Sequence, residues 1–209
     1  MTTTSIQNIY NDYRTANEYP PNYTLDFFAK NPISLNNLDT FKDGNELKLF
    51  IELSWQHLNA LYQKDRYSDT TANAIKYLKI IDSKINQHHT TFIKDEWYYG
   101  ILLFKGMATC QLRDYKTSTS IFKALAEHDS KNKNYEDWLR YSKYRLHLRA
   151  SKMITVVSGL LLLIEIFLQK YIPSFFVRIS LDSIALIGLV GTLIYDYYIK
   201  RRFRVSNQK

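Results

Sequence analysis

The sequence LIEIFLQKYIPSFFVRISLDSI, residues 163–184, joins two long apolar runs and decides how the C-terminal part of the chain folds. The first run covers residues 153–172 and the second covers 179–199. A helix of about 20 apolar residues crosses a hydrocarbon core of about 30 Å. The connection between the runs is short and contains Pro173, so the two helices must be antiparallel neighbours. We therefore predict a transmembrane helical hairpin in residues 151–200, followed by a basic cytosolic tail in 201–209.

Basic residues flank this hairpin mainly on one side. Residues 131–152 carry seven lysines and arginines, five more follow residue 199, and the connection has only two. The positive-inside rule then places both termini in the cytosol, in an integral membrane protein of the cytoplasmic membrane if the source is bacterial. The same flanks favour contact with anionic lipids of the inner leaflet. Nucleic acid is not an expected partner, because the basic excess borders apolar runs instead of covering a folded domain.

The charged residues Glu165, Arg178 and Asp182 lie within or beside the two apolar runs. Counted from Pro173, the two carboxylates lie at similar depth. Arg178 precedes Asp182 by one helical turn and can pair with it, which is a structural interpretation. Carboxylates inside a membrane also serve as ion or proton paths and as contacts between helices. Both interpretations remain open.

Small residues occur at matched depths in the two runs. Gly159 and Gly188 are almost equally far from Pro173, and Ser158, Ala185 and Thr192 lie nearby. Small side chains let two helix backbones approach closely inside a membrane. We predict that Gly159, Ala185, Gly188 and Thr192 form the contact between the helices, and a homo-oligomer is a further possibility.

The remaining chain has helical and not strand periodicity, so the fold class is all-α. Residues 1–45 are punctuated by prolines and are expected to form short helices and loops that pack on a helical domain in residues 46–150. The segment YEDWLRYSKYRLHLRASK contains neither Pro nor Gly and leads into the first apolar run. One continuous helix is therefore expected from Tyr135 to Leu168.

The segment LLFKGMATCQLRDYKTSTSIFKAL, residues 102–125, resembles a tetratricopeptide repeat. The similarity lies in the small Gly106, the Asp114–Tyr115 turn, Ser118 and Phe122. It extends over about residues 46–150, with Ser54 as the small residue of an earlier unit, and is closest over 97–128. The proline that usually closes each unit is missing.

The resemblance implies a stack of helical hairpins whose concave face binds a protein or peptide. Carried over residue by residue, that groove would be lined by Ile51, Trp55, Asn59, Leu103, Met107, Gln111, Leu139, Lys143 and His147.

Motifs for other chemistry are scarce. Cys110 is the single cysteine, so the chain forms no internal disulfide, and the N-terminus has no pattern of a cleavable signal. The histidines lack the spacing of metal ligands, and no glycine-rich phosphate loop occurs, so neither a metal nor a cofactor is expected. Arg140 and His147 have the spacing seen in HEPN-type ribonucleases, to which this segment is similar; seven residues are about two helical turns, so both lie on one face.

Three functions follow from these patterns. The first is a membrane-anchored, non-enzymatic adaptor or scaffold that presents a tetratricopeptide-like domain to a protein or peptide in the cytosol. The alternative is a membrane effector that oligomerises through its hairpin to permeabilise or signal. The second alternative is an RNA-cleaving enzyme that uses Arg140 and His147.

Overall fold

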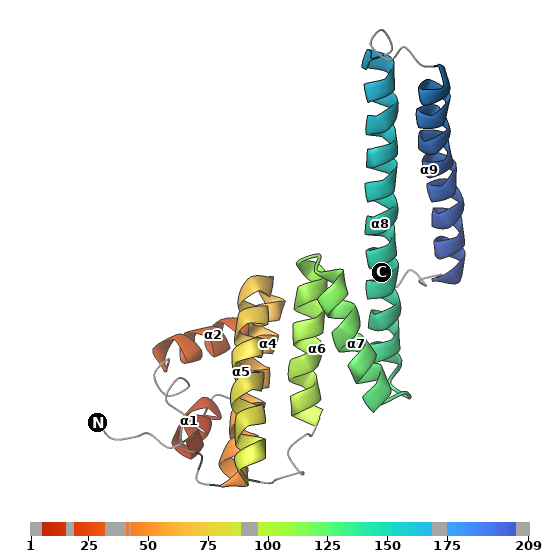
Figure 1. The fold of residues 1–209 in the computed structure, drawn as a ribbon. Helices are drawn as coiled ribbons and strands as arrows, with labels where there is room; N and C mark the ends of the chain where they lie inside the picture. Colours follow the sequence, from red (N-terminus) through yellow and green to blue (C-terminus); the bar gives the residue numbers. More distant parts are fainter. Residues whose placement is uncertain are drawn as a thin grey trace. The chain divides into compact units, whose positions relative to one another are not determined.

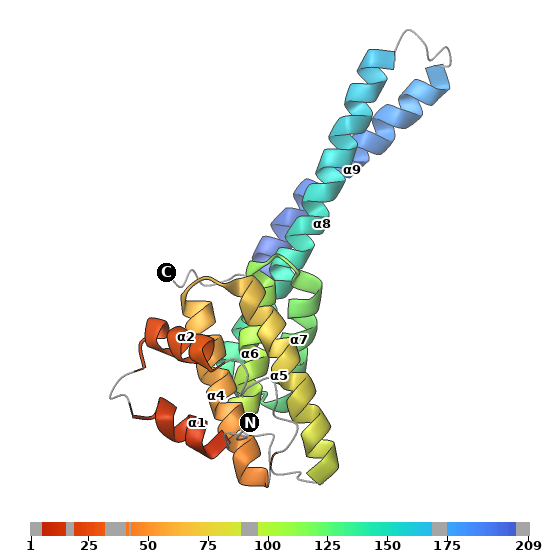
Figure 2. The same ribbon diagram turned by 90° about the vertical axis from the view of Figure 1, so that its left-hand side faces the viewer.

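The computed structural model describes residues 6–15, 19–31, 41, 43–88, 96–168 and 175–203 of the 209-residue chain. These residues form eight helices and no strand, which confirms the predicted all-α class (Figures 1 and 2). The helices are α1 (Ile6–Tyr13), α2 (Pro21–Lys30), α4 (Gly44–Gln63), α5 (Tyr67–His88), α6 (Glu96–Gln111), α7 (Tyr115–His128), α8 (Lys133–Leu168) and α9 (Phe175–Arg202).

The chain divides into two compact units, Met1–Tyr135 and Glu136–Lys209. We call them the helical unit and the hairpin unit. The division falls inside α8, earlier in the chain than the predicted start of the membrane segment at residue 151. Residues 136–150 therefore belong with the hairpin unit.

The helical unit is built from two antiparallel helix pairs. Helix α4 packs on α5, α6 packs on both of them, and α7 packs on α6 (Figure 1). The apolar stripe of α4 supplies much of the core: Leu47, Phe50, Ile51, Leu53, Leu58 and Leu61 are at most 2% exposed. Removing these side chains from water is the main force that holds the pairs together.

The N-terminal helices α1 and α2 both pack on α4. Ile6, Ile9 and Phe28 join the same core, and the Tyr13 hydroxyl lies 3.0 Å from Thr24 Oγ1. The Tyr10 hydroxyl donates to Glu52 on α4, with 2.9 Å to Oε2.

Both helix pairs turn in the same way. Asp65 and Arg113 have left-handed backbones, with φ values of 55° and 65°. In each turn the next amide returns to the preceding helix, Arg66 N to Leu61 O at 3.0 Å and Asp114 N to Thr109 O at 2.9 Å. These bonds satisfy carbonyls that the end of a helix leaves unpaired.

The shared turn sets a correspondence between the two helix pairs, and it differs from the one inferred from sequence. Superposing Asp65 on Arg113 pairs Leu58, not Ser54, with Gly106. A built Cβ on Gly106 would lie 3.0 Å from Phe122 on α7. The positions that match Gly106 and Phe122 in the first pair are Leu58 and Ala74, both 0% exposed. The large and small residues are thus exchanged between the two pairs, which keeps the space between the helices filled.

In the hairpin unit, α8 and α9 lie side by side and antiparallel in both views (Figures 1 and 2). Helix α8 is continuous from Lys133 to Leu168, which confirms the prediction of one helix across Tyr135–Leu168. Helix α9 begins at Phe175, earlier than the apolar run itself, and continues to Arg202. The predicted turn at Pro173 lies outside the described residues.

Candidate functional site

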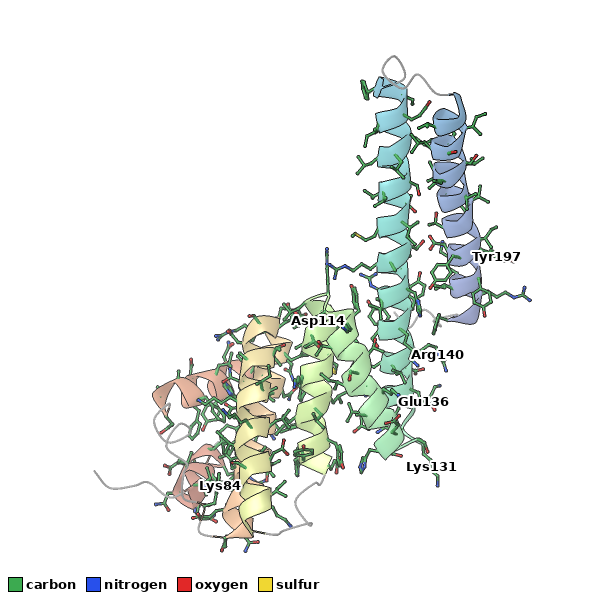
Figure 3. The ribbon with its side chains drawn as sticks, in the orientation of Figure 1. Lys84, Asp114, Lys131, Glu136, Arg140 and Tyr197 are labelled. Carbon is green, nitrogen blue, oxygen red and sulfur yellow. The ribbon has the colours of Figure 1, made fainter. Side chains whose placement is uncertain are left out.

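The outer surface of the hairpin unit is apolar. In the described part of the chain, every exposed large hydrophobic residue except Ile75 and Leu112 lies between residues 153 and 198. Helices α8 and α9 are both long and apolar enough to cross a membrane, and only 11% of the most apolar window of each is buried. Tyr197 is one of these exposed residues and is 69% exposed on α9 (Figure 3).

Small and polar side chains fill the contact between α8 and α9. Thr155 Oγ1 donates to Thr192 Oγ1 at 3.2 Å, and Ser158 lies directly against the backbone of Gly188. Ala185 continues this row and is 1% exposed. We call Thr155, Ser158, Ala185, Gly188 and Thr192 the small-residue seam. A side chain at Gly188 would overlap with Ser158 Oγ, so Ser158 would have to move before a larger residue could fit there at this close approach.

Gly159 does not belong to the seam. A Cβ built on it meets no atom within 4 Å, so the residue faces open space. The predicted pairing of Gly159 with Gly188 is therefore wrong, and Ser158 takes its place. The reason is geometric: adjacent helical residues are about 100° apart around the axis, so only one of them can face the partner helix.

Beyond the Thr155–Thr192 end of the seam lie His147, which the sequence patterns singled out, and Ser151 and Asp196, which they did not. The Tyr195 hydroxyl lies 2.7 Å from His147 Nδ1. Ser151 and Asp196 occupy opposite positions in the register set by the Thr155–Thr192 bond. Ser151 Oγ and Asp196 Oδ1 are both buried without a hydrogen-bond partner among the described residues. Sequence reasoning could have noticed Asp196 as a carboxylate near the end of an apolar run.

The structure describes the side chains of two of the three predicted intramembrane charges. Glu165 is half-buried, whereas Asp182 is exposed on the surface of α9. The side chain of Arg178, and with it the predicted Arg178–Asp182 pair, lies outside what the structure describes.

A second candidate surface lies on α4 and α6 of the helical unit. Trp55 fits directly over Gly100, with ring centroids 4.7 Å from Trp97 and 5.7 Å from Phe104. Further half-buried or exposed residues follow along the two helices: Asn59 on α4, and Leu103, Met107 and Gln111 on α6. We call Trp55, Asn59, Leu103, Met107 and Gln111 the α4–α6 face.

The other predicted groove residues lie elsewhere. Ile51 is 0% exposed in the core, so its side chain is inaccessible to a partner. Leu139, Lys143 and His147 are half-buried on α8 and belong to the hairpin unit. His147 contacts Tyr195 and stacks near Phe203, at 5.8 Å between ring centroids. The helical period alone does not show that Ile51 faces inward, because both faces of α4 carry large side chains.

The two residues of the ribonuclease alternative have ordinary structural partners. Arg140 is exposed and lies 3.9 Å from Asp137 one turn earlier (Figure 3). The Nδ1 atom of His147 is occupied by the Tyr195 hydroxyl. In the part of the chain that the structure describes, no group of three His, Cys, Asp or Glu residues is placed to hold a metal ion.

Comparisons of the chain with protein-family models, with curated proteins and with solved structures yield no match. What the protein does is therefore inferred from its own residues and their geometry.

Proposed function

We propose that this protein is a membrane-anchored adaptor that holds a tetratricopeptide-like helical unit in the cytosol, where it binds a protein or peptide partner. The observation that carries the proposal is the contrast within the hairpin unit. Its outward residues are large and apolar, and its inward seam is small and polar. Water-soluble helix pairs have the opposite arrangement, whereas helices that face lipid have this one.

The charge distribution supports an orientation with both termini in the cytosol. The basic residues of 131–152 and of the C-terminal tail lie on the side of the hairpin away from the connection. Lysine and arginine are retained on the cytoplasmic side during insertion, and each contributes about 1 kcal/mol when it lies near anionic lipid.

The α4–α6 face supports a role in partner binding. It combines an aromatic ring, an aliphatic side chain, a thioether and two amides, all at least partly accessible. Surfaces with apolar anchors and adaptable polar groups accept an amphipathic helix or a peptide. The two helix pairs with their common turn support the tetratricopeptide-like description, although Leu58 replaces the small residue in the first pair.

Partner capture from solubilised membranes tests the adaptor function. We expect Met107→Glu to reduce recovery of a specific partner at least about tenfold, because it places a charge in an apolar contact. Ile75→Glu is the matched control, since Ile75 is 51% exposed on α5 and lies outside the face. Recovery of the same partners by both variants would contradict the proposed binding surface.

One observation favours the oligomerising effector as a second candidate. Asp182 is exposed on a helix whose neighbouring side chains are apolar, and an exposed carboxylate in lipid is costly unless another protein surface covers it. Gly159 and Gly191 also face open space, where a second copy could approach.

Cross-linking in membranes should then give oligomers that Asp182→Leu alters, together with leakage of a vesicle-trapped dye. Monomers without leakage would exclude this function.

A further inference from the structure

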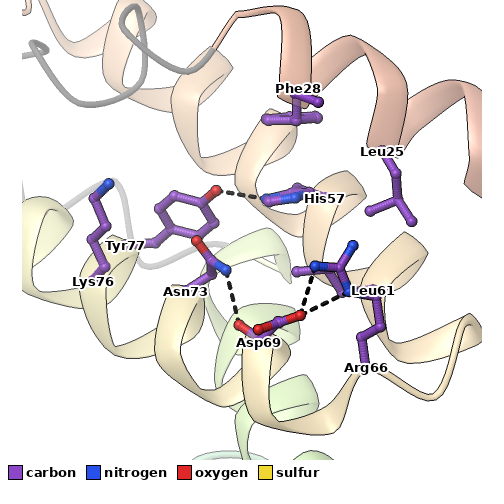
Figure 4. Close-up of a pocket in the computed structure, with 10 residues that line it drawn as sticks. Leu25, Phe28, His57, Leu61, Arg66, Asp69, Asn73, Lys76 and Tyr77 are labelled. Atoms are coloured by element: carbon purple, nitrogen blue, oxygen red, sulfur yellow. Dashed lines mark hydrogen bonds and ion pairs between the residues drawn. The ribbon is translucent and has the colours of Figure 1, made fainter.

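A cavity of about 310 Å³ lies in the helical unit between α2, α4 and α5 (Figure 4). Leu25, Phe28 and Leu61 provide its apolar wall. Polar side chains from α4, from α5 and from the turn between them provide the rest. The volume is at the lower end of the range of small-molecule sites.

His57 is held in this cavity in a defined orientation. Its ring stacks on Phe28, with 4.3 Å between centroids, and its Nδ1 lies 2.7 Å from the Tyr77 hydroxyl. Burial raises the pKa of the Tyr77 hydroxyl, so this group keeps its proton. It has no other hydrogen-bond partner among the described residues, so it donates to Nδ1.

This bond determines which ring nitrogen of His57 carries the proton. Burial, and next the nearby Arg66 guanidinium, lower the pKa of His57 to about 4, so the ring is neutral near pH 7. With Nδ1 as the acceptor, the single ring proton lies on Nε2. Nε2 has no protein partner within the described residues, and His57 therefore offers the cavity an N–H donor.

Two positive charges line the same cavity. Arg66 uses Nε and Nη2 to bind Asp69 Oδ2, both at 2.7 Å, which leaves the two N–H groups of Nη1 unused within the described structure. Lys76 lies on the α5 side (Figure 4). Arg66 and Lys76 both lower the pKa of His57, and Asp69 only partly opposes them. A field that disfavours a proton on His57 favours an anion beside it.

We propose that this cavity binds a small organic anion. Its carboxylate or phosphate group would be held by Arg66 Nη1 and His57 Nε2–H, and the Lys76 ammonium group would add positive charge on the α5 side of the cavity. Its apolar part would lie against Leu25 and Leu61. Asp69 orients the Arg66 guanidinium and offsets part of its positive charge, while the N–H groups of Nη1 still point away from Oδ2. This site is separate from the α4–α6 face.

Histidine NMR on the full-length protein in detergent micelles tests the proposal directly. The probes are inorganic phosphate, phenyl phosphate and benzoate, added at pH 7 to protein with ¹⁵N-labelled histidine. We expect phenyl phosphate or benzoate to shift the Nε2 signal of His57 and to bind about tenfold more tightly than inorganic phosphate, because of the apolar wall. Phenyl phosphate should also raise the pKa of His57 above about 4, since a bound anion stabilises the protonated ring.

Two lysines on α5 provide the matched variants. Lys76 and Lys79 are both exposed, but only Lys76 lines the cavity. Lys76→Gln should weaken binding of the organic probe about tenfold, and Lys79→Gln less than about twofold. Circular dichroism confirms that both variants fold. The proposal is overturned if no probe shifts the His57 signals at about 10 mM, if both variants bind equally, or if inorganic phosphate binds as tightly as phenyl phosphate.

Discussion

At the scale of single residues, Gly100 allows α4 and α6 to approach. The indole of Trp55 occupies the space that a side chain at this position would need, and Trp97 and Phe104 flank that indole. The ring cannot move away without losing these aromatic contacts, which contribute about 0.5–1.5 kcal/mol each beyond burial. Gly100 is thus a packing requirement of the α4–α6 face.

Gly100→Ala should lower the free energy of unfolding by about 1–2 kcal/mol, because overpacking outweighs the gain in helix propensity. Urea denaturation of the full-length protein in micelles, followed by tryptophan fluorescence, measures the effect. Gly191→Ala is the control, since a Cβ there meets no atom within 4 Å. Equal stability of the Gly100→Ala variant and the wild type would show that Trp55 is not fixed by this contact.

His57 makes the stability of the helical unit depend on pH. Its pKa is lowered from 6.5 to about 4, so between these values the unfolded chain binds more protons than the folded one. Stability is therefore complete above about pH 6.5 and falls as the pH drops towards 4, by about 3 kcal/mol. His57→Gln, which can keep a hydrogen bond to Tyr77, should show a smaller fall. Denaturation curves at pH 7.5 and 4.5 measure the free energy of unfolding of the wild type and of the variant. An equal loss of this free energy in both proteins would show that His57 does not cause the pH dependence.

At the scale of helices, two kinds of contact determine which helices pair: the left-handed turns in the helical unit and the small-residue seam in the hairpin unit. The left-handed residues Asp65 and Arg113 end α4 and α6 in the same way. In the hairpin unit, the bond between Thr155 and Thr192 aligns α8 with α9, and Gly188 sets their separation. Each pairing thus depends on a few backbone or small-side-chain positions.

A designed disulfide tests the helix register of the hairpin. Thr155→Cys with Thr192→Cys, in a Cys110→Ala background, should oxidise readily because the two hydroxyl oxygens are 3.2 Å apart. Adding Gly188→Leu should reduce disulfide formation several-fold, since the new side chain overlaps with Ser158. Gly191→Leu should leave disulfide formation unchanged, because a side chain at this position points into open space. Gel mobility with and without reductant measures the yield, and equal yields for the two variants would refute the seam.

At the scale of the whole molecule, the solvent around the hairpin unit is the central property. The exposed surface between residues 153 and 198 is far more apolar than that of the helical unit. A contiguous surface of this kind is not stable in water and marks contact with lipid or protein. The hairpin unit is therefore expected to be surrounded by lipid and the helical unit by water.

Fractionation and protease protection test this arrangement. The full chain should remain in membranes after carbonate washing and be released by detergent, because hydrophobic burial in lipid does not depend on salt or pH. Tags at both termini should resist protease added outside intact cells and be cut after lysis. A monodisperse full-length protein without detergent, or an outside-accessible C-terminal tag, would contradict the membrane anchor.

Sequence alone was sufficient for the all-α class, for the continuous helix through Tyr135–Leu168 and for the two apolar helices, because helical period and run length are local properties. Those properties also placed Ala185, Gly188 and Thr192 in one row. Only the tertiary structure decided that Ser158 and not Gly159 faces the partner helix, that Ile51 is core, and that Leu58 matches Gly106. It also brought Leu25, His57 and Arg66 around one cavity. Such facts depend on the rotation and register of packed helices, and these are set by contacts between residues far apart in the chain.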